Sequence, residues 1–147
     1  MNPPLEPKII QHSKLCWRLP LIALQQLLNE NAFWAKQRSH SELRRMLRGS
    51  QAVVSLWEAG ELAGFGRANS DRIYRAVLWD VVIDQKRRKQ GNGRLLLEAL
   101  LKHPAVIGVD RVYLMTTNQT GFYSQLGFNK IVNQCLMGKF KELDKSG

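Results

Sequence analysis

The segment DQKRRKQGNGRLLLEALLK, residues 84–102, constrains the fold more than any other part of the chain. It joins the apolar run VLWDVVI, typical of a buried strand, to an apolar helix pattern through four consecutive cations and two glycines. Cations are slightly unfavourable at a helix start, because the helix macrodipole is positive there. A glycine turn at the same place exposes backbone N–H groups that bind anions. The segment therefore predicts a strand–turn–helix unit whose turn receives an anion.

The glycine spacing separates this turn from two widespread phosphate-binding loops. The chain has no GxxxxGK[ST] run, and Gly91 and Gly93 lack the third glycine of the dinucleotide-binding fingerprint. The pattern present is R-x-x-G-x-G, which begins at Arg88. The alternative interpretation is an ordinary strand-to-helix connection with a solvated basic surface.

Length and composition indicate one soluble globular domain. The chain has 147 residues, 44% hydrophobic and 23% charged, and we expect a single domain over 1–147 with frayed tails at 1–7 and 142–147. The net charge of +10 predicts an anionic partner, but it does not choose among nucleic acid, a membrane surface and a phosphorylated small molecule.

The cysteines and apolar runs limit the type of protein further. Cys16 and Cys135 form no metal-binding spacing, so we expect reduced thiols and no metal site. No apolar run approaches the ~20 residues of a membrane span, and no signal peptide is present. The sequence therefore predicts a cytoplasmic protein without a membrane partner.

Hydrophobic periodicity predicts alternating strands and helices, and hence an α/β (α+β) domain with a mixed sheet. The expected cap of the second helix is Ser39 or Ser41, and Gly49 ends that helix. The predicted strands lie at 8–12, 53–57, 62–67, 73–84 and 110–117, with a final strand or hairpin at 128–140. The predicted helices lie in 19–33, 40–49, 92–103 and 118–128.

The order of these motifs resembles the GNAT superfamily of N-acetyltransferases. The R-x-x-G-x-G turn follows a long apolar strand and precedes GFYSQLGF by about thirty residues. The resemblance covers about residues 21–140 and is strongest to the cyanobacterial and plastid branch, which includes serotonin N-acetyltransferases and plastid protein N-acetyltransferases. It implies a twisted, mostly antiparallel sheet flanked by helices, with strands four and five splayed apart.

The resemblance also implies a reaction. Acetyl-CoA would be the co-substrate, with no metal, and its acetyl group would pass to a primary amine by direct attack on the thioester. The acceptor would be an arylalkylamine or a protein lysine or N-terminal amine. Three groups of residues would contact acetyl-CoA: Val81, Val82 and Ile83 on the strand; Arg88, Lys89, Gln90, Gly91, Asn92, Gly93 and Arg94 in the turn; and Thr116, Asn118 and Tyr123 later in the chain.

Two residues are candidates for proton transfer. Tyr123 matches the family's general acid toward the CoA sulfur, and a core tyrosine is the alternative. Asp80 is an acid inside an apolar strand, which is costly unless it is paired or functional. It serves as base or substrate ligand, or as a structural acid beside the bulge that the family has in this strand. Thr116 stands where the family has asparagine or aspartate and cannot be a base.

The acceptor side is less constrained by the sequence. We expect Trp79, Asp80 and Arg67 to contact the amine substrate. Trp79 lines an aromatic acceptor pocket or packs in the core, and the same two interpretations apply to Trp34, Trp57 and Phe65.

Two other functions compete with acetyl transfer. A basic nucleic-acid-binding module is one, although KRRK carries no interleaved aromatic residue. A GNAT fold that binds acyl-CoA without turnover is the other. The sequence leaves open the acceptor's size, the acyl-chain preference and homodimer formation.

Overall fold

The computed structural model describes residues 6–12 and 19–141. Cys16 and most of the two predicted tails lie outside the described residues. Cys135 is exposed and forms no disulfide with a described residue. The chain divides into two compact units, Met1–Met115 and Thr116–Gly147. The expectation of one domain over 1–147 stays a prediction.

The first unit is built on a five-stranded mixed sheet, as predicted. Its strands lie in the order β1-β2-β3-β4-β5, antiparallel from β1 to β4 and parallel between β4 and β5. The parallel pair follows from the helical crossover between these two strands. The strands are β1 (Lys8–Gln11), β2 (Ala52–Glu58), β3 (Glu61–Ser70), β4 (Arg75–Ile83) and β5 (Arg111–Tyr113).

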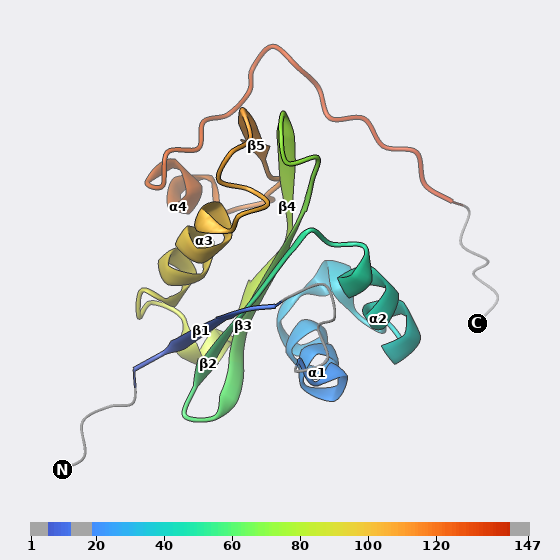
Figure 1. The fold of residues 1–147 in the computed structure, drawn as a ribbon, viewed down its shortest axis with the longest axis vertical. Helices are drawn as coiled ribbons and strands as arrows, with labels where there is room; N and C mark the ends of the chain where they lie inside the picture. The colour runs from blue at the N-terminus through green and yellow to red at the C-terminus, as the bar shows by residue number, and fades with distance from the viewer. Residues whose placement is uncertain (1–5, 13–18, 142–147) are drawn as a thin grey trace. The chain divides into compact units, whose positions relative to one another are not determined.

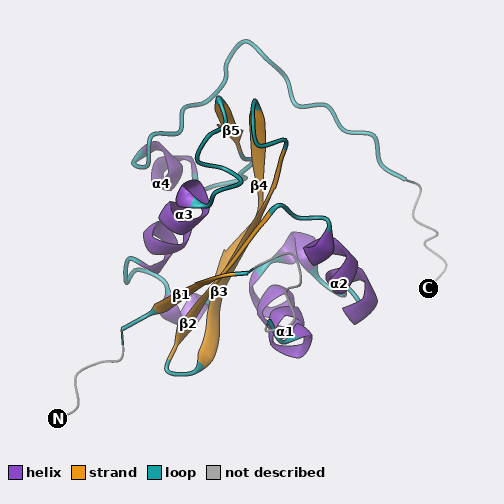
Figure 2. Ribbon diagram, in the orientation of Figure 1, coloured by secondary structure: helices purple, strands orange, loops and turns teal. Residues whose placement is uncertain are grey.

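Helices cover both faces of this sheet (Figures 1 and 2). The helices α1 (Leu21–Asn31) and α2 (His40–Arg48) pack on one face, joined by the short 3-10 turn η1 (Phe33–Ala35). Helix α3 (Asn92–Lys102) packs on the other face, after the 3-10 turn η2 (Gln85–Arg87). The leucines of α1 and α2 form the core together with sheet residues Val53, Phe65 and Val82.

Helix α2 begins at a capping box, which fixes the loop before it. The Ser39 hydroxyl accepts a hydrogen bond from Glu42 N, and the Glu42 carboxylate accepts one from Ser39 N. This selects Ser39 over Ser41 as the cap, and Gly49 ends the helix as predicted. The residue before the box, Arg38, pairs with Asp80 of β4 at 2.9 Å.

Helix α3 approaches β3 closely at Gly66. A Cβ at this position would lie 2.6 Å from Leu100 Cδ1, so a side chain here would require the Leu100 side chain to move. Val81 of β4 lies on the same side, with its Cγ2 3.6 Å from that point. The glycine therefore leaves room for the Leu100 side chain against the middle of the sheet.

Strand β4 carries the bulge that the family resemblance implies. Its pairing with β3 shifts by one residue between Phe65 and Arg67, and Asp80 lies at this shift with φ 52°. Pairing between β4 and β5 covers only Arg75 to Val77 on β4. Residues 78–83 of β4 therefore have no β5 partner, in agreement with the predicted splay.

The second unit differs from its prediction. It contains α4 (Thr120–Ser124), but residues 128–141 form neither helix nor strand, so the predicted final strand is wrong. Residues 129–141 are exposed throughout. Apolar residues form a strand only where a ladder partner satisfies the backbone. The fifth strand is likewise shorter than the expected 110–117.

No helix among the described residues is long and apolar enough to cross a membrane.

Candidate active site

The glycine turn before α3 has the geometry of an anion site. Gly91 lies at φ 80° directly before the helix, and Lys89 also has a positive φ of 65°. No side chain of the described residues caps the helix, so its first N–H groups have neither an intrahelical acceptor nor a side-chain acceptor among those residues. A Cβ at Gly91 would meet nothing within 4 Å, so the space beside this glycine, directly before the helix, is open.

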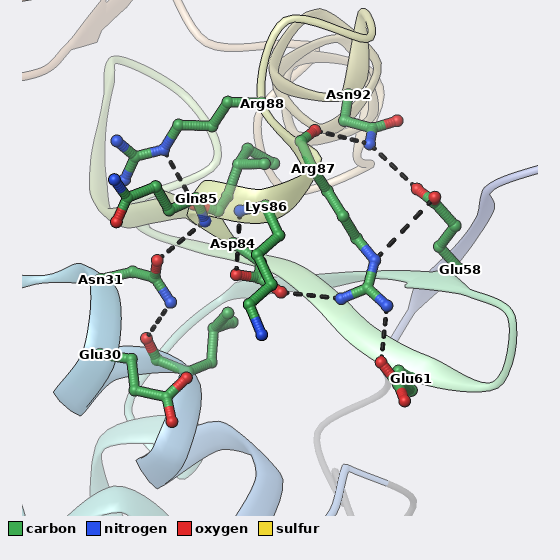
Figure 3. A network of polar contacts seen from close by, with 12 residues as sticks. Glu30, Asn31, Glu58, Glu61, Asp84, Gln85, Lys86, Arg87, Arg88 and Asn92 are labelled. Carbon is green, nitrogen blue, oxygen red and sulfur yellow. Dashed lines mark hydrogen bonds and ion pairs between the residues drawn. The ribbon is translucent and has the colours of Figure 1, made fainter.

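Arg87 anchors this turn to the sheet instead of facing an anion (Figure 3). Its guanidinium pairs with Glu61 at 2.6 Å and Asp84 at 2.7 Å, and Glu58 lies 3.9 Å away. The hydrogen bond to Glu61 is the main cause that raises the pKa of Arg87. This arginine is therefore occupied by acids, and the sequence analysis, which began the anion-binding turn at Arg88, did not assign it a role.

Asn92 and Gln85 complete the anchoring. The buried Asn92 amide donates to Glu58 at 3.2 Å and to the Arg87 carbonyl at 3.1 Å, while Gln85 N donates to Asn31 Oδ1 of α1 at 2.9 Å. These bonds hold the turn to β2 and α1 (Figure 3). Asn92 was predicted to contact the cofactor, and that prediction now applies to its backbone N–H alone.

The other cations of the turn lie at the surface. Within the described residues, neither Lys86 nor Lys89 has an acid within 4.0 Å. Arg88 donates only to the Ile83 carbonyl, at 3.2 Å, and Arg94 pairs with Glu98 at 3.1 Å. Positive charge therefore surrounds the open donors of the turn, and these residues fit a diphosphate.

The strand that leads into the turn offers backbone groups. Beyond Val77, β4 pairs with β3 on one edge and has no β5 partner on the other. The Val82 side chain lies in the core, while Val81 and Ile83 are half-buried. The contacts predicted between these three residues and acetyl-CoA would therefore be made by their main-chain N–H and C=O groups.

Asp80 gathers three donors at the bulge. Arg67 Nε donates to its Oδ2 at 2.8 Å, and Arg38 donates to both oxygens, at 2.9 and 3.3 Å. Trp34 Nε1 donates to Oδ1 at 3.0 Å. The sequence analysis expected both Arg67 and Asp80 at the acceptor but missed Arg38, because no spacing rule links residues separated by 42 positions.

These partners decide the ionisation of Asp80. Burial opposes the charged form, but hydrogen bonds and charges of Arg38 and Arg67 outweigh it and lower the pKa of Asp80. A carboxylate with both oxygens engaged and a lowered pKa is a poor proton acceptor near neutral pH. The arrangement is better suited to positioning the two arginines.

The remaining aromatic residues that were candidates for an acceptor pocket differ in solvent exposure. Phe65 is fully buried in the core, and Trp57 donates to Ser55 Oγ at 2.8 Å. Trp34 is 50% exposed, and Trp79 is half-buried opposite Arg67 in the ladder. Trp34 and Trp79 therefore stay candidates for contact with an acceptor.

Tyr123 lies in the second unit, on α4. Its ring makes edge contacts with Phe122 and Phe128, and burial raises its pKa, so the phenol keeps its proton. Thr116 Oγ1 accepts a hydrogen bond from Gln119 N at 3.1 Å, and Asn118 is exposed. The roles of these three residues stay predictions.

Comparison with known families identifies the family of this chain. Residues 21–128 match the model of the acetyltransferase (GNAT) family. The chain belongs to the GNAT family. Among solved structures, a GNAT protein of Xanthomonas campestris pv. campestris is 25% identical with a TM-score of 0.78, over 92% of this chain and 94% of the other.

Relatives of this GNAT protein occur in plants, as the sequence resemblance indicated. Serotonin N-acetyltransferase 2, chloroplastic, of rice is 34% identical over 97 residues, which are 63% of this chain and 48% of the relative. Histone acetyltransferase TAP1 of soybean is 31% identical over 115 residues, 70% of this chain and 49% of the relative. The chain thus spans about half the length of these two relatives.

Proposed function

We propose that this GNAT protein transfers the acetyl group of acetyl-CoA to a primary amine. The observation that carries the proposal is the direct succession of an unpaired strand edge and a cationic glycine turn, β4 followed by residues 84–93. An extended chain ending in a diphosphate needs both features, one beside the other.

The turn would hold the phosphates. The open N–H groups at the start of α3 and the surface cations Lys86, Arg88 and Lys89 would receive the diphosphate and the 3′-phosphate. The free edge of β4 would pair with the amide groups of the pantetheine arm. A backbone N–H near Val81 would stabilise the negative charge that develops on the thioester oxygen.

The transfer needs a neutral amine and a proton for the departing sulfur. The amine nitrogen attacks the thioester carbonyl, an N–C bond forms, and the C–S bond breaks as the thiolate takes the Tyr123 proton. The proton that the amine nitrogen loses passes to solvent, and solvent returns a proton to the Tyr123 phenolate. Arg38 and Arg67, held in place by Asp80, would contact the acceptor at a point away from its amine nitrogen. Asp80 acts in this scheme as a positioning residue.

The acceptor is an arylalkylamine or a protein amine. The similarity to proteins named serotonin N-acetyltransferase and histone acetyltransferase supports both classes. The half-exposed Trp34 beside the Asp80 cluster favours an acceptor with an apolar body.

Replacing Tyr123 with phenylalanine should lower kcat by about 100-fold or more and leave the acetyl-CoA KM within about threefold, because a proton donor acts mainly in the transition state. Steady-state thiol release measures both quantities. Tyr74→Phe, a change at an exposed tyrosine of the first unit, is the control and should behave as wild type. An unchanged kcat in Tyr123→Phe would remove this residue from the mechanism.

The proposal as a whole is tested by titration calorimetry and a transfer assay. Acetyl-CoA should bind with micromolar affinity, and 3′-dephospho-CoA more weakly. Thiol release in the presence of an amine panel then measures turnover. Absence of acetyl-CoA binding would overturn the proposal. Tight binding without turnover on any amine would favour a non-catalytic acyl-CoA-binding role.

A further inference from the structure

The geometry points to an acceptor that carries its own anionic group, a carboxylate or a phosphate, which Arg38 and Arg67 bind beside the bulge of β4. This inference rests on the proposed acetyl transfer and names the class of amine that it uses: a small aromatic or apolar amine with an acidic substituent.

The charge around Asp80 is unbalanced. Two guanidinium groups face one carboxylate, at 2.8 and 2.9 Å. In the part of the chain that the structure describes, no other acid lies within 4.0 Å of either arginine. A half-buried guanidinium without its own counter-charge is costly. The cluster therefore has the charge to take up one more anion.

Both arginines also have free donors. Arg67 Nε and Nη1 are used by Asp80, Ser50 and Asn69, which leaves Nη2 without a partner among the described residues. Arg38 uses Nη1 and Nη2, which leaves Nε. No side-chain nitrogen or oxygen in the described residues is both buried and unpartnered, so these donors reach the surface.

The exposure of the two side chains suits a ligand. Arg38 is 28% exposed and Arg67 is 16% exposed, so each guanidinium is held in place but can be reached from solvent. Preorganised arginines that present planar donors bind carboxylate and phosphate groups with directional hydrogen bonds. Asp80 fixes both guanidinium groups and so preorganises them for a ligand.

An aromatic surface adjoins the arginines. Trp34 and Phe33 stack edge to face at 5.1 Å and are 50% and 71% exposed. The indole nitrogen of Trp34 is tied to Asp80, so this surface is held next to the guanidinium groups. An acceptor with an apolar body and an acidic end would contact both.

Binding of a matched pair of amines tests the inference. The probes are 4-(2-aminoethyl)benzoate and its carboxamide, which share shape and amine and differ in one negative charge; tyramine O-phosphate against tyramine tests the phosphate form. Each is titrated into wild-type protein with and without saturating CoA. At least one acid of the two pairs should bind about tenfold or more tighter than its neutral partner, since charge-assisted hydrogen bonds are the stronger kind.

Variants identify the residues responsible. Arg67→Gln and Arg38→Gln should each bring the acid-to-neutral affinity ratio close to one, while acetyl-CoA affinity stays unchanged. Arg44→Gln, which removes an equal charge from the exposed face of α2, should keep the wild-type ratio. If Arg67→Gln is unstable, the affinity ratios of Arg38→Gln and of the wild type still test the inference. Arg38→Gln is expected to fold, because Asp80 keeps Arg67 and Trp34 as partners in that variant.

The outcomes separate this inference from the proposed function. A ratio near one in wild type for both pairs, or binding of no probe, overturns the anionic acceptor even if acetyl-CoA binds and a neutral amine is acetylated. A high ratio in protein that fails to bind acetyl-CoA supports the anion site and overturns the transferase.

Discussion

Replacing Gly91 with glutamate is expected to weaken acetyl-CoA binding by at least about 100-fold. The new carboxylate would enter the open space before α3, where a phosphate is proposed to lie. Two like charges about 4 Å apart repel by about 4 kcal/mol at a protein surface, which exceeds the roughly 2.7 kcal/mol of a 100-fold change. Titration calorimetry with acetyl-CoA measures the effect.

Two controls separate charge from backbone strain. Gly91 has φ 80°, so Gly91→Ala carries the same cost of about 1–2 kcal/mol for a left-handed residue without the charge, and should lose much less affinity. Gly60→Glu adds the same charge at a turn glycine with φ 76° and open space. It should bind acetyl-CoA as wild type does. Unchanged affinity in Gly91→Glu would mean that the turn holds no phosphate.

Replacing Asp80 with asparagine is expected to lower the free energy of unfolding by about 3–5 kcal/mol, the typical cost of removing one partner from a buried ionic cluster. Arg38 and Arg67 would then face each other without a counter-charge. Asparagine tolerates the positive φ of 52° at this position, so the backbone adds little to the loss. Urea unfolding followed by circular dichroism gives the value, and Asp110→Asn, a change at an exposed acid, should stay within about 0.5 kcal/mol.

The pH dependence of this difference has a defined sign. The folded pKa of Asp80 is lowered, so its carboxylate stabilises the fold fully above its unfolded pKa of about 3.9. The contribution is lost as pH falls through the folded value. The difference between wild type and Asp80→Asn should therefore be constant from neutral pH to about pH 5 and shrink below about pH 4. A difference that changes between pH 6 and 8 would contradict the lowered pKa.

Local patterns in the sequence predicted most of the first unit. Apolar periodicity placed α1, α3 and the β2–β3 hairpin, and the Ser39 and Gly49 signals bounded α2, because these features depend on near neighbours in the chain. The bulge and the splay came from family resemblance. Pattern alone does not show where one strand slips against another.

The site was less predictable, because its contacts join distant residues. Arg87 resembles its three cationic neighbours in sequence, and only the fold brings Glu58 and Glu61 beside it. Arg38 reaches Asp80 through a loop whose path depends on the packing of α1 against α2. The prediction of a last strand was wrong for a related reason, since β-rich composition alone does not supply a partner strand.

The part of β4 without a β5 partner, residues 78–83, has a cost. An unpaired strand edge in an apolar run is where sheets of separate molecules join and aggregate. A bulge twists such an edge and makes pairing with a foreign strand less regular. Here the bulge lies at Asp80, within the part of β4 that β5 does not pair. If the pantetheine arm occupies this edge, the bound substrate also prevents the edge from pairing with a strand of another molecule. Protein kept without coenzyme would then be the form that is hardest to keep in solution.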